Sequence, residues 1–347
     1  MGFMGQLSFF IQIRKGFRVV RLFVAVIVAS IMGLAGAAYW WVDQPISMRA
    51  GVVDVAIAPG MSARAIASEI EEAGAAVDPD FLYWWFRISG QSRLIKAGSY
   101  ELEGSTTPRS LLRKLVQGDQ AVRAITLLEG WTFSQVREAL KRADHLRPTA
   151  LQMSELEIMR LLGKSGIPAE GQFFPDTYTY PKGSTDMALL QRASQAMDKH
   201  LADAWNQRSP TLTALKTPNE LLVLASIVEK ETGRPGDRSM VASVFNNRLR
   251  IGMRLQTDPT VIYGMGAAFD GNLRKADLST DTPWNTYTRA GLPPTPIAMP
   301  GKASLLAAAN PAQSKALYFV ARGDGTSQFS ESLDAHNRAV NKYQRAR

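Results

Sequence analysis

Two glutamates close an apolar helical segment in the C-terminal part of the sequence, and they are its best candidates for acid–base chemistry. Glu229 and Glu231 follow the run LLVLASIV, which is apolar on nearly every side and therefore predicts a buried central helix. Thr217-Pro218-Asn219-Glu220 supplies a capping box and a proline in the first turn, so the helix should begin there. A carboxyl at the end of such a helix suits a general acid that protonates a leaving group.

Glu229 and Glu231 should face different surroundings. They differ by two positions, roughly 200° around a helix with about 3.6 residues per turn. Glu229 lies behind the small residues Ala225 and Ser226, which would leave room for a ligand, whereas Glu231 follows bulky residues and can already lie beyond the helix. We therefore expect Glu229 to be the acid. The alternative is an exposed last turn in which Glu229 forms a surface pair with Lys230.

The composition offers few residues that could bind a metal ion or a cofactor. The chain has no cysteine and only three histidines, which are scattered at His145, His200 and His336. This excludes thiolate sites and leaves little for a histidine metal centre or a Ser-His-Asp hydrolase. Gly163-Lys164-Ser165 and Gly264-Met265-Gly266 imitate phosphate and dinucleotide loops, but each lacks a required glycine. We expect no metal and no cofactor, with catalysis by carboxylates.

The charge distribution argues against nucleic acid as a partner. The net charge is +9, and four of the positive charges lie in the first 21 residues, at Arg14, Lys15, Arg18 and Arg21. The rest of the chain has no basic run with interleaved aromatic residues, which is the pattern expected of a nucleic-acid groove. We expect no nucleic-acid partner.

Residues 22–42 form an uncharged stretch that is long enough to cross a membrane as a helix rising about 1.5 Å per residue. Residues 1–21 are a short basic segment, and Tyr39, Trp40 and Trp41 stand where the far membrane interface would lie. This asymmetry predicts a single-pass anchor with the N-terminus in the cytoplasm and the body exported. A cleaved signal peptide and a buried core helix are the alternatives.

Residues 46–144 are expected to form a small α+β module after the anchor. A strand, a Pro-Gly turn and a helix follow one another in residues 53–70, and a weaker copy recurs about seventy residues later. Ser62 and Thr132 would cap the two helices. The arrangement resembles the LysM fold, which implies a module that contacts peptidoglycan.

Aromatic residues cluster between the two copies. Phe81, Tyr83, Trp84, Trp85 and Phe86 fall inside one helical pattern. Such a cluster is typical of a packed core, although stacking on sugar rings would use the same residues. We expect the cluster to lie in the core.

Residues 145–347 are expected to form a mostly helical α+β domain, so the fold class is α+β behind a single N-terminal transmembrane helix. Asp258-Pro259 is typical of a helix cap followed by the first helical residue, and Asp258 is therefore set aside as a second catalytic carboxylate. Segments 283–287 and 291–297 combine polar, aromatic, glycine and proline residues. That composition suits a sugar groove or plain turns.

Several long motifs in one order resemble the endolytic murein transglycosylases, the MltG type of the YceG-like family. The matching stretches are Glu170 to Tyr178, LASIVEKET, FNNRLRIGMRLQTDPTVIYG, WNTY, GLPPTPI and the closing LYFVARGDG. In that family the glutamate after Ser-Ile-Val is catalytic, which places this role on Glu229. Two departures stand out: Ser327-Gln328 replaces a common Gly-His, and Asn246 fills a position that is commonly apolar.

The resemblance implies non-hydrolytic cleavage of the β-1,4 bond between N-acetylmuramic acid and N-acetylglucosamine. Glu229 would protonate the glycosidic oxygen and then take the proton of the muramyl 6-hydroxyl as it attacks C1, which gives a 1,6-anhydro end and needs no second carboxylate. Gln256, Thr257, Asn285 and Tyr287 would orient the sugar. An enzyme anchored in the bacterial inner membrane, with a periplasmic body, would act on nascent strands, limit their length and work beside cell-wall synthases.

Two other functions fit the same sequence. A non-catalytic scaffold would bind peptidoglycan through both parts and tether the cell-wall synthesis machinery. A hydrolase would need a carboxylate to activate water, so Glu170, Asp176 or Asp258 would have to lie beside Glu229.

Overall fold

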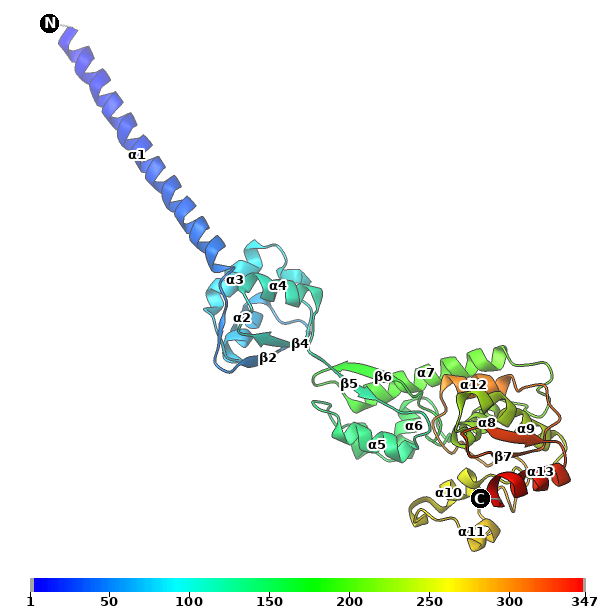
Figure 1. The fold of residues 1–347 in the computed structure, drawn as a ribbon. Helices are drawn as coiled ribbons and strands as arrows, with labels where there is room; N and C mark the ends of the chain where they lie inside the picture. The colour runs from blue at the N-terminus through cyan, green and yellow to red at the C-terminus, as the bar shows by residue number, and fades with distance from the viewer. Residues whose placement is uncertain (1–2, 346–347) are drawn as a thin grey trace. The chain divides into compact units, whose positions relative to one another are not determined.

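The computed structural model describes residues 3–345, with side chains described from Arg21 onward. The chain divides into two compact units, Met1–Val122 and Arg123–Arg347 (Figure 1). Sequence analysis placed this boundary after residue 144. The difference arises because the second copy of the strand, turn and helix packs with the chain that follows it, where Phe133, Val136 and Phe173 share one core.

The first unit begins with the long helix α1 (Phe3–Trp41). Its stretch Arg21–Trp41 has 21 residues and a mean hydropathy of 2.2, and its most apolar part is not buried by the rest of the chain. By length and composition this helix can cross a membrane, so it is a candidate anchor at the predicted position.

A two-stranded antiparallel sheet and three helices form the body of the first unit. Strand β2 (Val52–Ile57) pairs with β4 (Gly98–Glu103), with Val55 opposite Tyr100. Alternate residues of β2 point inward, as the period of a strand requires. The other elements are β1 (Ser47–Met48), which pairs with β3 (Ala75–Ala76), and the helices α2 (Ala63–Glu72), α3 (Pro79–Ile88), η1 (Ser92–Leu94) and α4 (Pro108–Gln117).

Only part of the aromatic cluster on α3 belongs to the core of this unit. Phe86 is fully buried, and Tyr83 and Trp85 are half-buried, whereas Phe81 and Trp84 are exposed. The expectation that the cluster lies in the core was therefore wrong for two of its five members. Helix α3 packs against α2 and α4, and its exposed aromatic residue Phe81 contacts Trp41 at the end of α1.

The predicted repeat of strand, turn and helix is confirmed. Gly60 and Gly130 occupy the two turns with φ of 82° and 76°, a conformation that favours glycine. Ser62 and Thr132 cap the helices that follow, each accepting a hydrogen bond from a backbone N–H of the first turn. The two copies lie in different units, because α5 (Phe133–Arg142) belongs to the second.

The first part of the second unit packs helices against a pair of strands. Strand β5 (Val122–Thr126) pairs with β6 (Thr177–Pro181). Residues from these strands, from α5 and from α7 (Asp186–Asn206) share one core. Two short elements complete this part, η2 (Ala150–Gln152) and α6 (Glu155–Leu161).

Helix α8 (Pro218–Glu231) is the buried central helix that the sequence predicted. The side chain of Thr217 accepts from the backbone of Glu220, and the Glu220 carboxylate accepts from the backbone of Thr217, which completes the capping box. Residues 221–228 are all buried against α7, α9 (Arg238–Arg250) and α12 (Lys302–Ala309). Glu231 is the last residue of this helix and does not lie beyond it.

Short helices and one hairpin complete the second unit. Strand β7 (Tyr318–Ala321) pairs with β8 (Ser327–Ser330) in antiparallel fashion. The mixture of helices and small antiparallel sheets agrees with the predicted α+β class. The helical elements of this part are η3 (Pro235–Asp237), α10 (Asp258–Met265), η4 (Gly266–Ala268), α11 (Lys275–Ser279), α13 (Leu333–Val340) and the π-helical turn η5 (Asn341–Arg345).

Candidate active site

The carboxyl group of Glu229 is buried, and both of its oxygens contact other residues of the protein. Its side chain is 7% exposed. The backbone N–H of Gly301 donates to Glu229 Oε2 at 2.9 Å, and Arg238 Nη2 lies 3.5 Å from Oε1. On the same side of α8, the Ser226 hydroxyl donates to the carbonyl of Val223 and accepts from the backbone N–H of Ile297.

A second carboxylate, Glu129, lies close to Glu229, and sequence analysis missed it. Arg238 Nη2 is 4.0 Å from Glu129 Oε2, so one guanidinium faces both carboxylates. Burial raises the pKa of Glu129, and the negative charge of Glu229 raises it further, while Arg238 opposes the shift. A Cβ atom at Gly301 would fall 1.8 Å from Glu129 Oε1, so the backbone approaches this carboxylate closely.

Glu231 has different surroundings, as the helical spacing predicted. Burial raises its pKa, and the charge of Asp258 raises it further, whereas a hydrogen bond donated by the Thr257 hydroxyl and the charge of Arg248 act in the opposite direction. A carboxyl whose pKa is raised keeps its proton to higher pH, which is the state a general acid needs.

Glu231 lines an open pocket of about 450 Å³. The pocket combines aromatic side chains with hydrogen-bonding groups, which is the mixture that sugar recognition uses. His336 belongs to this wall, and its ring stacks on Tyr318 with the centroids 5.2 Å apart. The lining residues are Glu231, Phe245, Arg248, Leu255, Gln256, Asp258, Tyr287, Tyr318, Phe319, Leu333, His336 and Asn337.

Two of the four predicted sugar-binding residues line this pocket beside Glu231. Gln256 is exposed and has a φ of 50°, an uncommon backbone conformation for a residue other than glycine. Tyr287 donates its hydroxyl proton to Asp258 Oδ1 at 2.6 Å. Thr257 is buried and reaches Glu231 directly.

Asn285 has a structural environment. Its side chain is fully buried, and its Nδ2 donates to three backbone carbonyls, those of Asp277, Leu278 and Thr280. Its Oδ1 accepts from the backbone of Tyr287. All its hydrogen-bonding groups are thus used within the protein, and Asn285 positions the loop that carries Tyr287.

Asp258 does not have the capping role that the sequence suggested. Thr257 is the residue that precedes α10, and Asp258 is the first helical residue. Its carboxylate instead faces Tyr287 and the pocket. The cap prediction failed because Asp-Pro is equally compatible with the first helical turn, where an acidic side chain is also favourable.

The other carboxylates considered for a hydrolase lie elsewhere. Glu170 is buried, and its charged and hydrogen-bonding neighbours are Phe133, Tyr263 and Glu155, with neither glutamate of α8 among them. Asp176 is exposed and accepts from the adjacent backbone N–H of Thr177.

The two sequence departures lie away from the hydrogen bonds of Glu229 and Glu231. Gln328 lies in β8, where it accepts from Arg322 at 2.6 Å and donates to the backbone of Phe329. Asn246 is buried in α9, and its Oδ1 is without a hydrogen-bond partner among the described residues. Neither contacts Glu229 or Glu231 through a hydrogen bond in the described part of the chain.

Comparison with known proteins places this arrangement in a family. Residues 55–342 match the family described as YceG-like. A Bacillus subtilis protein named endolytic murein transglycosylase is 31% identical over 310 residues, which cover 84% of this chain and 84% of the relative. A protein of the same name from Streptococcus pneumoniae D39 is 28% identical over 322 residues, which cover 83% of this chain and 58% of that longer relative.

A solved structure agrees with this assignment. The crystal structure of a YceG-like protein from Listeria monocytogenes matches with a TM-score of 0.53 at 28% identity. The match covers 83% of this chain and 98% of the Listeria chain. With the family match extending over most of its length, this chain belongs to the YceG-like family.

Proposed function

We propose that this protein is a membrane-anchored endolytic murein transglycosylase that cuts the β-1,4 bond between N-acetylmuramic acid and N-acetylglucosamine. Two relatives carry that name, and the family extends over residues 55–342. The observation that carries the proposal is a buried carboxyl with a raised pKa, Glu231, in an open pocket lined by aromatic and polar residues. A carboxyl whose pKa is raised keeps its proton to higher pH than an ordinary glutamate, which is what donation to a glycosidic oxygen requires.

The geometry favours Glu231 over Glu229 as the acid. Glu231 and three of the residues expected around the sugar, Gln256, Thr257 and Tyr287, lie together. Both glutamates have protein partners, Gly301 and Arg238 at Glu229 and Thr257 at Glu231, and Glu231 in addition lines the pocket. The family resemblance pointed to Glu229, and that role remains the alternative that the experiment below tests.

The reaction follows from a single carboxyl group in two protonation states. Protonated Glu231 gives its proton to the glycosidic oxygen, the C1–O bond breaks, and the N-acetylglucosamine side leaves as an alcohol. Positive charge develops at C1 of the muramyl sugar, and the nearby carboxylate of Asp258 stabilises it. The muramyl 6-hydroxyl then attacks C1 and loses its proton to Glu231, which restores the acid and forms the 1,6-anhydro ring.

The pocket supplies groups that orient the sugar chain. Tyr287 lines the pocket, and the exposed residues Gln256 and Asn337 offer amides to a ligand. Arg248 fixes the pocket floor, because it donates to the backbone carbonyls of Leu255 and Leu317. These contacts hold together segments that are far apart in the sequence, so the reacting groups keep their positions before substrate binds.

The anchor determines which strands the enzyme reaches. With α1 in the bacterial inner membrane and the N-terminus in the cytoplasm, the part of the first unit that follows α1 and the whole second unit lie in the periplasm. The substrate is then nascent glycan near the membrane, the enzyme limits strand length, and cell-wall synthases are its neighbours. The LysM-like first module contacts the peptidoglycan strands.

The test is mass spectrometry of uncrosslinked glycan strands incubated with the chain from residue 44 onward, as wild type, Glu231→Gln and Glu229→Gln. Glu138→Gln, an exposed change on α5, serves as the matched control. We expect 1,6-anhydromuramyl fragments from wild type, Glu138→Gln and Glu229→Gln. Glu231→Gln should form these fragments much more slowly or not at all.

The other outcomes separate the competing proposals. Loss of products in Glu229→Gln with Glu231→Gln active would assign the acid to Glu229. Reducing ends would identify a hydrolase and give Asp258 the role of activating water. Glycan binding without cleavage by any form, including the full membrane-bound chain, would support the scaffold.

A further inference from the structure

Helix α3 is apolar on two opposite sides, and only one of them faces the core. Leu82 and Phe86 are buried against the first unit. Phe81, Trp84 and Ile88 are 61%, 56% and 78% exposed. At about 100° per residue, these three side chains fall within an arc of about 60°. A short surface helix with an outward apolar stripe is expected to contact a membrane or another protein through that stripe.

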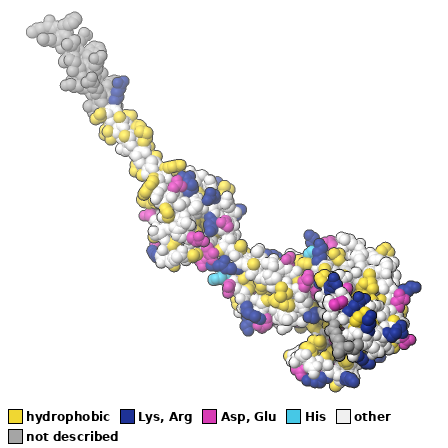
Figure 2. Space-filling model, in the orientation of Figure 1, with side chains coloured by type: hydrophobic (Ala, Val, Ile, Leu, Met, Phe, Trp, Pro, Cys, Tyr) yellow, Lys and Arg dark blue, Asp and Glu magenta, His cyan; other side chains and the backbone are white. Residues whose placement is uncertain are grey.

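The stripe begins beside the end of the candidate membrane helix. The ring of Trp41, the last residue of α1, meets the ring of Phe81 edge-on with the centroids 6.0 Å apart. Tyr39 and Trp40, in the same last turn, are 69% and 66% exposed. Figure 2 shows hydrophobic side chains along α1 and at the place where this helix meets the rest of the unit.

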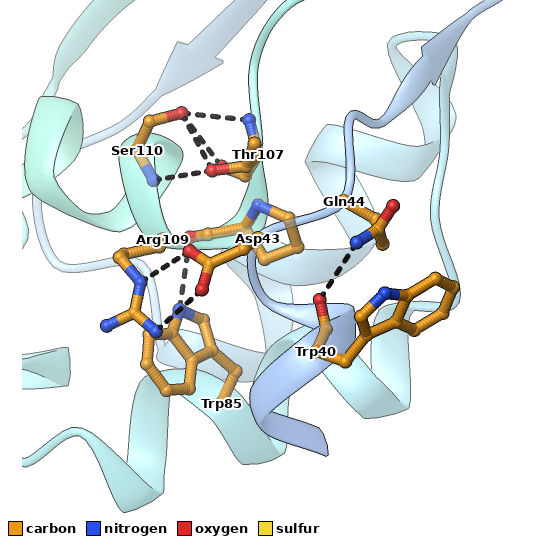
Figure 3. A network of polar contacts seen from close by, with 8 residues as sticks. Trp40, Asp43, Gln44, Trp85, Thr107, Arg109 and Ser110 are labelled. Carbon is orange, nitrogen blue, oxygen red and sulfur yellow. Dashed lines mark hydrogen bonds and ion pairs between the residues drawn. The ribbon is translucent and has the colours of Figure 1, made fainter. Parts of the chain in front are cut away.

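Polar contacts fix the end of α1 against the unit (Figure 3). Asp43 and Arg109 form a two-bond ion pair at 2.6 and 3.1 Å, and Arg109 also donates its backbone N–H to the carbonyl of Val42. The indole N–H of Trp85, on α3, donates to the carbonyl of Pro108 at 3.0 Å. The start of α4, the second half of α3 and the end of α1 are thus tied together, so α3 keeps one place relative to the end of the membrane helix.

Basic residues flank the stripe. Arg87 on α3 and Arg93 in η1 are exposed, and Leu94 next to Arg93 is 58% exposed. Apolar and aromatic residues bordered by arginines are typical of helices that lie in the interface of a bilayer, where the apolar side enters the acyl boundary and the cations meet lipid phosphates.

We propose that the outward face of α3, formed by Phe81, Trp84 and Ile88, lies in the membrane interface on the exported side. The occupant is lipid because the stripe continues from Trp41 and the aromatic end of α1, which themselves stand at the interface of the proposed anchor. The inference rests on that anchor and adds a second contact. This contact adds a second attachment of the first unit to the bilayer beside the membrane helix.

The absence of cysteine from the chain allows a direct test. Full-length protein in vesicles of phosphatidylethanolamine and phosphatidylglycerol carries one introduced cysteine, labelled with an environment-sensitive fluorophore, in the variants Trp84→Cys and Ile88→Cys. Ala56→Cys is the matched control, because Ala56 is exposed on β2, at the end of the unit away from α1 in Figure 1. Val28→Cys reports on the anchor itself.

Lipids carrying a nitroxide at a shallow acyl position should quench the labels at 84 and 88 and leave the label at 56 bright. Removing phosphatidylglycerol should weaken that quenching, because Arg87 and Arg93 lose their anionic partners. If deep nitroxides quench the label at position 28 while the labels at positions 84 and 88 stay as bright as the label at position 56, the inference is overturned and the anchor stands. No quenching at 28 would overturn the anchor. Labels at 84 and 88 protected from both lipid nitroxides and aqueous iodide would mean that protein covers this face, which also overturns the proposal.

Discussion

Replacing Glu170 with glutamine should change how the stability of the second unit depends on pH. The residue is 6% exposed, and its carboxyl oxygens accept from the backbone N–H of Phe133 at 3.1 and 3.2 Å. The hydroxyl of Tyr263 also bonds to it. Burial outweighs these bonds and raises the pKa of Glu170 to about 7. Glutamine keeps the size and one acceptor but cannot ionise.

The pKa difference sets both the sign and the size of the effect. The ordinary pKa of 4.5 applies to the unfolded chain, so the folded state binds more protons between that pH and about 7. The stability contribution of Glu170 is complete below pH 4.5 and is lost as the pH rises through about 7. Between pH 5 and pH 8 this loss amounts to about 2.5 kcal/mol.

Urea unfolding of the chain from residue 44 onward, at pH 5 and at pH 8, measures this loss. The free energy of unfolding of Glu170→Gln minus that of wild type should increase by about 2.5 kcal/mol between the two pH values. Glu138→Gln, an exposed substitution on α5, should leave the difference from wild type unchanged. A constant difference for Glu170→Gln would refute the reasoning, because it would mean that burial does not hold the proton on this carboxyl.

Three further substitutions separate folding roles from catalytic ones. Asp186 is fully buried and accepts from the backbones of four residues, so Asp186→Ala should cost about 3 kcal/mol in urea unfolding; a cost below about 1 would contradict that role. Asn285→Ala should lower stability by about 2 kcal/mol and leave the KM of the folded fraction unchanged, whereas a raised KM with normal stability would restore its predicted contact with sugar. Tyr287→Phe removes the hydroxyl that donates to Asp258, and it should reduce kcat about tenfold with an unchanged Tm, as checked by product formation and thermal unfolding.

The elements whose signals are local could be predicted from the sequence. The capping box at Thr217 and Glu220 fixed the start of α8, and the apolar run after it required burial. The repeated turns at Gly60 and Gly130 need a backbone conformation that glycine adopts readily, so both helices that follow could be placed. Helical geometry also separated Glu229 from Glu231, because an angle along one helix depends only on spacing.

The environments of those two glutamates depended on the tertiary structure. Glu229 accepts a hydrogen bond from Gly301, 72 positions away, and pairs with Arg238, which also faces Glu129. Glu231 accepts a hydrogen bond from Thr257, 26 positions away. No periodic pattern reports which remote loop will cover a given side of a helix. Burial, charge and room for a ligand are properties of several segments together, so the sequence alone identified the two glutamates and their separation on the helix, and the packed fold gives each one its surroundings.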